Sequence, residues 1–559
     1  MSTSTVGSYL ATRIVQSGAR DFFSVPGDFN LVLLDEFLKQ SGLRMIGCCN
    51  ELNAGYAADG YARATGGLAV VVVTYMVGGL SVINAAAGAY SDDLPLLVVS
   101  GGPNTNDAPA NHLLHHTLAE HNFYHTEKCF EPVVGATFNI RHVGDAPRMI
   151  DAAVTACLAK RKPVYLEIAC NLAGAPVPAP GPLTLPPPAG TSDPAALAAA
   201  VDAAASRINK SVKPVLVGGV KLRSTGACGG FLKLADALGC AVAVMPDAKG
   251  LVPEDHPAFT GTYWGDVGSP NCAEIVESSD CQIFAGPVFN DYTTTGWTTL
   301  TPPGKLVHAG PDFLLMEGFD FSGLRLAEFL EVLAGKVKRN DSSLVSYRRQ
   351  HDEPAPAVAS AESAPLSTKE LRRQIQVLLT PESDVVIETG DSWFNGQKLR
   401  LPPGARYFFQ MQYGSIGWAT GATLGVSLAS GSRRRTVSLI GDGSFQLTAQ
   451  EVSTMIRHGA DPVIFLLNNR GYTIEVEIHD GPYNNIKNWD YAGLMEVLNA
   501  GEGNGLGLRA RTAGELADAI AKALSHLGPV LIECALDRDD CTPELLEWGS
   551  RVAAANSRP

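Results

Sequence analysis

Short runs of β-branched and aliphatic residues alternate with alanine-rich stretches along almost the whole chain, and this alternation restricts the fold most. Strands that are apolar throughout are buried on both faces, which is typical of parallel sheets covered by helices on each side. We therefore predict an α/β protein with doubly wound parallel sheets. The predicted strands cover residues 69–74, 96–100, 164–168, 215–217, 241–245, 306–308, 385–388, 437–440, 463–467 and 530–533.

Two segments interrupt this alternation and divide the chain into three blocks. Residues 174–194 are rich in proline among small residues, and residues 349–368 are rich in proline, alanine and serine. Both are predicted to be interdomain linkers, too stiff and too poor in large side chains to form packed elements. A chain of 559 residues is also too long for one hydrophobic core. The predicted domains are 1–175, 195–345 and 368–559.

Composition excludes several classes of partner. The net charge of −14 argues against nucleic acid or an anionic membrane surface, because phosphate contacts need clustered lysine and arginine. The longest apolar run, 68–77, is about half of the ~20 residues that a membrane span needs. Residues 1–18 do not have the pattern of a signal peptide, and the eleven cysteines show no CxxC spacing. We therefore expect a cytoplasmic protein in a reducing compartment.

Two polar turns follow neighbouring predicted strands in the third block. Residues 441–444 read GDGS, and residues 468–472 read NNRGY. The carboxyl ends of parallel strands share one edge of the sheet, where α/β proteins bind ligands. Asp442 and Asn469 offer the hard oxygens that Mg²⁺ prefers, and Gly443 lets the backbone approach a pyrophosphate at a helix N-terminus. Each turn alone is common, but the pair predicts a magnesium–diphosphate site.

A family resemblance extends these motifs over essentially the whole chain. GDGS and NN occur together with VPGDFN near the start, IETGDSWFN and GSIGW before them, and GYTIEVEIHDGPYN after them. With these motifs the chain resembles the thiamine-diphosphate-dependent 2-keto acid decarboxylases, and within them the forms that act on pyruvate, the bacterial forms looking nearest. The resemblance implies a pyrimidine-binding N-terminal domain, a non-catalytic Rossmann-like middle domain and a diphosphate-binding C-terminal domain.

The resemblance also implies the reaction and the assembly. Thiamine diphosphate and Mg²⁺ would be the cofactors, and pyruvate would be split without oxidation into acetaldehyde and CO2. The thiazolium C2 would add to the keto carbon, CO2 would leave, and an enamine would be protonated before the aldehyde is released. Because the family binds its cofactor between two chains, a homodimer is expected as the minimal active unit, within a homotetramer.

Five residues are expected to be catalytic by this resemblance. Glu51 matches the carboxylate that binds the aminopyrimidine ring, although a carboxylate at a helix start is also favourable without any such role. His115 and His116 match an active-site pair. The histidine-rich segment around them is otherwise a surface cluster, and its spacing lacks a closed set of zinc ligands. Asp28 and Glu475 match the remaining proton-transfer residues.

The remaining expected roles also follow from the resemblance. Ile416 matches the apolar residue that bends the cofactor, and the carbonyl of Gly414 would accept from its pyrimidine amine. Trp393, Ile474 and Ile478 would crowd the substrate pocket and favour a small 2-keto acid. The cofactor-binding set is Glu51, Thr389, Asp391, Gly414, Ile416, Gly443, Ser444, Asn469, Tyr472 and Ile474, and the metal set is Asp442, Asn469 and Gly471.

Three alternative functions stay open at this point. A decarboxylase of bulkier acids such as phenylpyruvate or indolepyruvate would share the same motifs, since one methylene in a pocket changes selectivity by only ~1–3 kcal/mol. A carboligating or flavin-dependent member of the same superfamily is the second. A cofactor-binding scaffold without activity is the third, and it would be expected to lack a proton-transfer residue.

Overall fold

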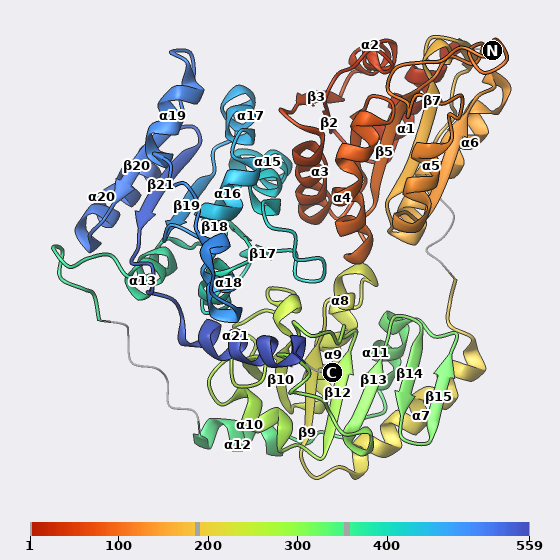
Figure 1. Cartoon of the computed structure of the whole chain (residues 1–559). Helices are drawn as coiled ribbons and strands as arrows, with labels where there is room; N and C mark the ends of the chain where they lie inside the picture. The colour runs from red at the N-terminus through yellow and green to blue at the C-terminus, as the bar shows by residue number, and fades with distance from the viewer. Residues whose placement is uncertain (1–2, 185–189, 351–357, 558–559) are drawn as a thin grey trace.

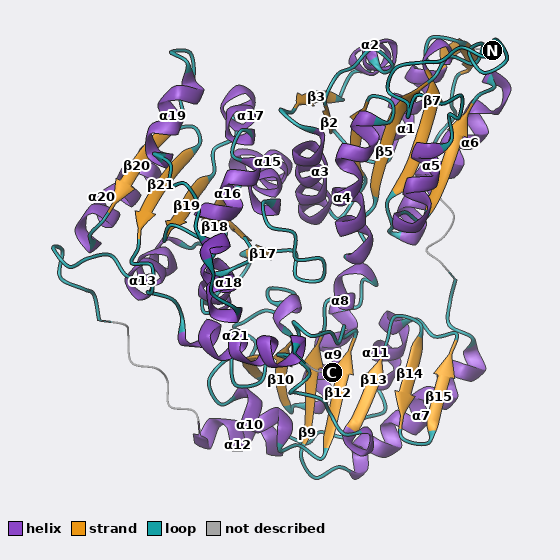
Figure 2. Cartoon of the chain, viewed as in Figure 1, coloured by secondary structure: helices purple, strands orange, loops and turns teal. Residues whose placement is uncertain are grey.

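The computed structural model describes residues 3–184, 190–350 and 358–557, and it contains three α/β units, each built on its own sheet (Figures 1 and 2). Every predicted strand agrees within two residues with an observed one. The predicted fold class, three largely parallel sheets covered by helices, is therefore confirmed. No helix among the described residues is both long and apolar enough to span a membrane.

The first unit contains a six-stranded parallel sheet in the order β3-β2-β4-β5-β7-β6. Its core strands are completely buried, as their unbroken apolar runs require. The strands are β2 (Asp21–Ser24), β3 (Arg44–Gly47), β4 (Ala69–Val73), β5 (Leu96–Gly102), β6 (Ala136–Ile140) and β7 (Val164–Ala169). The helices are α1 (Val6–Gln16), α2 (Leu31–Leu38), α3 (Glu51–Thr65), α4 (Val77–Ser91), α5 (His125–Phe130) and α6 (Ala146–Lys160).

The middle unit has a seven-stranded sheet in the order β11-β10-β9-β12-β13-β14-β15. The first five strands are parallel, whereas β14 and β15 extend the edge as antiparallel hairpins. The strands are β9 (Pro214–Gly218), β10 (Ala241–Val244), β11 (Phe259–Thr262), β12 (Cys281–Ala285), β13 (Leu306–Ala309), β14 (Phe313–Met316) and β15 (Phe319–Ser322). The helices are α7 (Pro194–Lys210), α8 (Lys221–Ser224), α9 (Cys228–Leu238), α10 (Cys272–Glu277), α11 (Leu326–Ala334) and α12 (Ser342–Gln350).

The third unit has a six-stranded parallel sheet in the order β17-β16-β18-β19-β21-β20. The strands are β16 (Ser383–Ile387), β17 (Arg406–Phe408), β18 (Arg435–Gly441), β19 (Val463–Asn468), β20 (Leu506–Ala510) and β21 (Val530–Ala535). The helices are α13 (Thr368–Leu378), α14 (Asp391–Gln397), α15 (Trp418–Ser430), α16 (Asp442–Thr448), α17 (Glu451–His458), α18 (Thr473–Ile478), α19 (Tyr491–Asn499), α20 (Ala513–Ser525) and α21 (Pro543–Asn556).

The interpretation of residues 174–194 as an unpacked linker is wrong at its start. Strand β8 (Pro176–Pro178) pairs antiparallel with β1 (Thr3–Thr5), and Val177 is buried. Proline lacks a donor, but it is tolerated in a short strand whose other edge needs no hydrogen bond. In the second predicted linker, α12 continues to Gln350, and residues 351–357 lie outside the described part of the chain.

The first and third units are joined by the crossing of α3 and α15, which lie side by side between the sheets of these two units (Figure 1). The two backbones are so close that a Cβ at Gly425 would lie 1.8 Å from the carbonyl oxygen of Ala57. A Cβ at Gly60 would similarly lie 2.4 Å from the carbonyl oxygen of Ala422. Small residues are therefore a steric requirement of this interface.

A buried ionic network closes the same interface. Arg63 is inaccessible to solvent and pairs with Asp59 at 2.6 Å and with Asp92 at 2.6 Å. Trp418 donates its indole N–H to Asp59 across the interface at 2.9 Å. Because buried charges are tolerated only when they are paired and hydrogen-bonded, the network also fixes the relative register of α3 and α15.

We predict that Gly425→Ala lowers the free energy of unfolding by about 1–3 kcal/mol or more, because the added methyl group forces the two helices apart. Gly229→Ala is the matched control, since Gly229 is exposed on α9 and a Cβ there meets no atom within 4 Å. Urea unfolding followed by circular dichroism measures both variants. Equal midpoints for the two would contradict a tight α3–α15 contact.

Candidate active site

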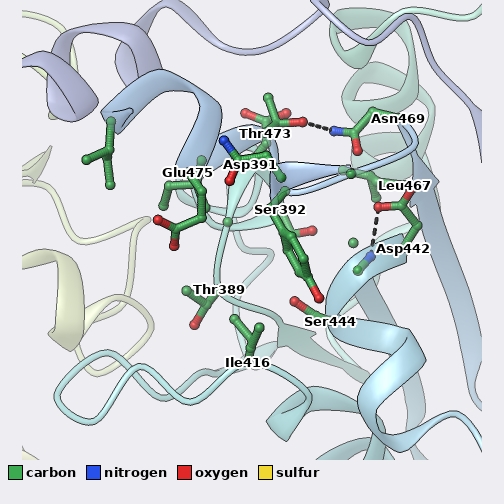
Figure 3. Close-up of a pocket in the computed structure, with 18 of the residues that line it drawn as sticks. Thr389, Asp391, Ser392, Ile416, Asp442, Ser444, Leu467, Asn469, Thr473 and Glu475 are labelled. Atoms are coloured by element: carbon green, nitrogen blue, oxygen red, sulfur yellow. Dashed lines mark hydrogen bonds between the residues drawn. The ribbon is translucent and has the colours of Figure 1, made fainter. Parts of the chain in front are cut away.

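A cavity of about 380 Å³ lies at the carboxyl ends of β16, β18 and β19 (Figure 3). Crossover connections of parallel strands leave their loops at this edge, so residues far apart in the sequence meet there. The cavity brings together most of the residues predicted to bind cofactor, metal and substrate. The predicted residues that line the cavity are Thr389, Asp391, Gly414, Ile416, Asp442, Gly443, Ser444, Asn469, Gly471, Tyr472, Ile474, Glu475 and Ile478.

Asp442 is completely buried at the first residue of α16. Its carboxylate accepts from the backbone N–H of Gly443 at 2.8 Å and from that of Arg470 at 2.6 Å. Loss of solvation raises the pKa of Asp442 to about 7, although these N–H groups act in the opposite direction. Within the described part of the chain no cationic side chain pairs with Asp442, and such a buried carboxylate is one that a divalent ion would stabilise.

Asn469 follows β19 and faces Asp442 across the loop (Figure 3). Its side-chain amide donates to the hydroxyl of Thr473, which directs the oxygen the other way. That oxygen, Oδ1, is buried and has no hydrogen-bond partner among the described residues. Because buried polar atoms are almost always paired, this oxygen is suited to bind a metal ion.

Gly443 makes the floor of the cavity accessible to a bulky anion. A Cβ at this position would lie 2.4 Å from the ring of Tyr472, so only glycine fits beneath that ring. Gly443 also belongs to the first turn of α16, where the helix itself provides no acceptors for the backbone N–H groups, although the N–H of Gly443 itself donates to Asp442. The donor set and the cradle together fit a metal–diphosphate group.

Glu388 lies in the motif IETGDSWFN but was not predicted as a site residue. It is completely buried at the end of β16 and accepts from the backbone N–H groups of Thr389 at 2.9 Å, Gly417 at 3.1 Å and Ala419 at 2.9 Å. It therefore caps the N-terminus of α15 and ties the loops that supply Thr389 and Ile416 to the cavity. Burial raises the pKa of Glu388 to about 7.

Asp391 at the start of α14 connects the cavity wall to the C-terminal helix. Its carboxylate accepts from the backbone N–H of Thr542 at 3.3 Å and from the side-chain amide of Asn395 at 2.8 Å. Thr542 is the N-cap of α21. Burial raises the pKa of Asp391 to about 6.

Apolar side chains line the opposite wall. Ile416 comes from the loop before α15, whereas Ile474 and Ile478 come from helix α18. They line the same cavity, together with Tyr292 of the middle unit. Trp393 does not line this cavity: it is buried behind Tyr292, with the two ring centroids 5.7 Å apart. Glu475 projects into the cavity from α18 (Figure 3).

The predicted catalytic residues of the first unit form a separate group. Asp28 contacts Nε2 of His115 at 2.8 Å and Nε2 of His116 at 3.8 Å. Glu51 begins α3, and its Oε1 would lie 3.4 Å from a Cβ at Gly78. None of these four predicted residues lines the cavity of the third unit in the same chain.

Several cavity residues were missed, although all except Tyr292 and Leu467 lie within motifs quoted above. Tyr292 comes from an irregular segment of the middle unit, and only the tertiary fold brings it here. Asn484 and Tyr483 belong to the sequence HDGPYN that carried the resemblance, so that motif was a usable signal. The missed residues are Tyr292, Gly390, Ser392, Gly441, Leu467, Thr473, His479, Tyr483 and Asn484.

Comparisons with known protein families cover all three units. The description "Thiamine pyrophosphate enzyme" applies to each match: the N-terminal TPP binding domain over residues 4–125, the central domain over 201–315 and the C-terminal TPP binding domain over 388–534.

Curated relatives match along nearly the entire chain. Pyruvate decarboxylase 1 of Arabidopsis thaliana is 50% identical over 562 residues, which cover 99% of this chain and 92% of the relative. Pyruvate decarboxylase 1 of Oryza sativa subsp. indica is 51% identical over 562 residues, with the same coverage of 99% and 92%. Pyruvate decarboxylase 1 of Pisum sativum is 50% identical over 562 residues, covering 99% and 94%. The expectation that bacterial forms look nearest stays a prediction.

The raised pKa of Glu388 predicts how the stability of cofactor-free protein depends on pH. Folding favours the protonated carboxyl, so this contribution is complete below about pH 4.5 and is lost as the pH rises through about 7. The urea midpoint should therefore fall between about pH 5 and about pH 8, and less steeply in Glu388→Gln. Glu382→Gln, an exposed glutamate beside the same strand, is the control. Parallel curves for Glu388→Gln and the wild type would exclude Glu388 as the source.

Proposed function

We propose that this chain, which belongs to the thiamine pyrophosphate enzymes and among them to the pyruvate decarboxylases, converts pyruvate to acetaldehyde and CO2. The observation that carries the proposal is the convergence of Asp442 with the Asn469 oxygen, which has no partner among the described residues, at the floor of a partly apolar cavity. Relatives of about 50% identity over nearly the whole chain bear the name pyruvate decarboxylase.

Thiamine diphosphate, when bound, supplies the nucleophilic thiazolium carbon and the electron sink for decarboxylation. We propose that Asp442, Asn469 and the Gly471 carbonyl hold Mg²⁺, with phosphate oxygens completing its shell. Thr389, Gly443 and Ser444 would contact the diphosphate. Gly414 and Ile416 would hold the ring system above it, as expected from the resemblance.

The residues of the chain would contribute desolvation and proton transfer. Ile474, Ile478 and Tyr292 give the substrate end of the cavity an apolar surface, which favours loss of charge as CO2 leaves. Glu475 lies beside this surface and lines the space that a small 2-keto acid would occupy. Asp28, His115 and His116 would move protons on the opposite side, and Glu51 would accept from the aminopyrimidine.

These two groups require two chains in our proposal. Asp28, Glu51, His115 and His116 belong to the first unit, whereas the cavity belongs to the third unit, and the same chain does not bring them together. We propose that one chain's first unit covers the cavity of its partner, so that a homodimer is the minimal active form and a homotetramer the complete assembly. We further propose a cytosolic location, which the scattered free cysteines support.

Restoring cofactors to stripped protein tests the reaction. Acetaldehyde should form from pyruvate only when thiamine diphosphate and Mg²⁺ are both added, and Asp442→Asn should need a higher Mg²⁺ concentration by about 10–100-fold. Asp461→Asn, an aspartate outside the cavity, is the control. No acetaldehyde despite cofactor binding would contradict the proposal, and turnover of phenylpyruvate instead would favour the bulkier 2-keto acids.

Mixing two inactive variants tests the shared site. Asp28→Asn removes a residue of the first unit and Glu475→Gln a residue of the third, so each homodimer should be inactive. Dissociation and reassociation of the mixture should restore acetaldehyde formation, because one of the two sites in a mixed dimer contains both native residues. A mixture that stays as inactive as its components would refute a site built from two chains.

A further inference from the structure

Asp28, His115 and His116, which we call the His–Asp cluster, bring two imidazoles and one carboxylate to a single point. Their ligand atoms all lie within 4.8 Å of one another. Among the described residues, no other group of three His, Cys, Asp or Glu side chains lies this close together. Both histidines present Nε2 to Asp28, His115 at 2.8 Å from Oδ2 and His116 at 3.8 Å from Oδ1. Two nitrogens and one oxygen are the ligands that borderline transition ions prefer.

The backbone arranges the two rings for a common target. Consecutive side chains of an extended segment point to opposite sides, yet the rings of His115 and His116 have centroids only 4.4 Å apart. His116 has a φ of 57°, a left-handed conformation that is costly for a residue other than glycine. Phe29 packs against the His115 ring with centroids 5.1 Å apart and limits its rotation.

The spacing also agrees with a coordination shell. Bonds of about 2.0–2.1 Å in a tetrahedral site place neighbouring donor atoms about 3.3 Å apart. The two contacts of Asp28, 2.8 Å and 3.8 Å, lie on either side of that separation. The side chains of His115 and Asp28 are 60% and 54% exposed in the single chain, which leaves room for a fourth ligand.

We propose that the His–Asp cluster is an inhibitory site for a divalent transition ion of the Zn²⁺ class. The ion occupies both Nε2 lone pairs and the carboxylate, and these groups then cannot accept or deliver protons. Mg²⁺ does not compete, since it selects oxygen ligands in octahedral geometry and belongs with Asp442 and Asn469. The inhibition rests on the proposed function, whereas binding of the ion does not.

Calorimetric titration of Zn²⁺ into holoenzyme saturated with thiamine diphosphate and Mg²⁺ tests the site directly. We expect one Zn²⁺ per chain, with the affinity lowered about tenfold or more in His116→Gln and in Asp28→Asn. His121→Gln is the matched control, because His121 is exposed in the same loop and lies outside the cluster. When Co²⁺ replaces Zn²⁺, the protein should show the strong visible absorption of a four-coordinate site. This absorption should be lost in His116→Gln and in Asp28→Asn.

Inhibition of acetaldehyde formation gives the second readout. Zn²⁺ should inhibit to the same extent when the Mg²⁺ concentration is raised tenfold. Unchanged Zn²⁺ affinity in His116→Gln, an equal loss in His121→Gln, or relief of inhibition by Mg²⁺ would each overturn the proposal. If the holoenzyme formed no acetaldehyde, the proposed function would fail, while the titration would still decide whether the cluster binds the ion.

Discussion

The contact between the backbones of α3 and α15 is the constraint on which the rest of the structure depends. Gly425 and Gly60 allow the two helices to touch, and Arg63 fills the adjoining space with charge that Asp59 and Asp92 neutralise. Glu51 lies at the start of α3, and the loop carrying Ile416 runs directly into α15. The crossing therefore sets where the two groups of proposed site residues lie with respect to each other.

The cavity wall and its immediate support contain groups that are unfavourable for folding. Asp442, Glu388 and Asp391 are buried carboxyls whose pKa values are raised to about 7, about 7 and about 6. Backbone N–H groups offset part of the desolvation cost, because each of these three carboxyls accepts at least one hydrogen bond from a backbone N–H. Such unfavourable burial of carboxyls is expected at a site for a polar ligand. A ligand that binds only the native state stabilises that state and offsets the cost.

The sequence predicted the parts of the molecule that local patterns determine. Unbroken apolar runs located the strands, and the polar turns after β18 and β19 located Asp442 and Asn469 at one edge of the sheet. Other features depend on distant contacts. The motif that contains Glu388 does not show which distant N–H groups this carboxyl accepts from. Tyr292 reaches the cavity from another unit, and β8 forms because β1 offers its edge. The burial of Trp393 behind Tyr292 was likewise inaccessible from neighbouring residues in the sequence.

The C-terminal helix determines when the cavity can be completed. Thr542 donates to Asp391 in the cavity wall, and Trp548 supports Tyr292 with ring centroids 5.1 Å apart. These residues are synthesised after everything else that shapes the wall. The first and middle units can fold while the ribosome is still translating, since domains fold in order of their emergence. The wall, in contrast, stays open until α21 has left the exit tunnel, so cofactor capture follows the synthesis of α21.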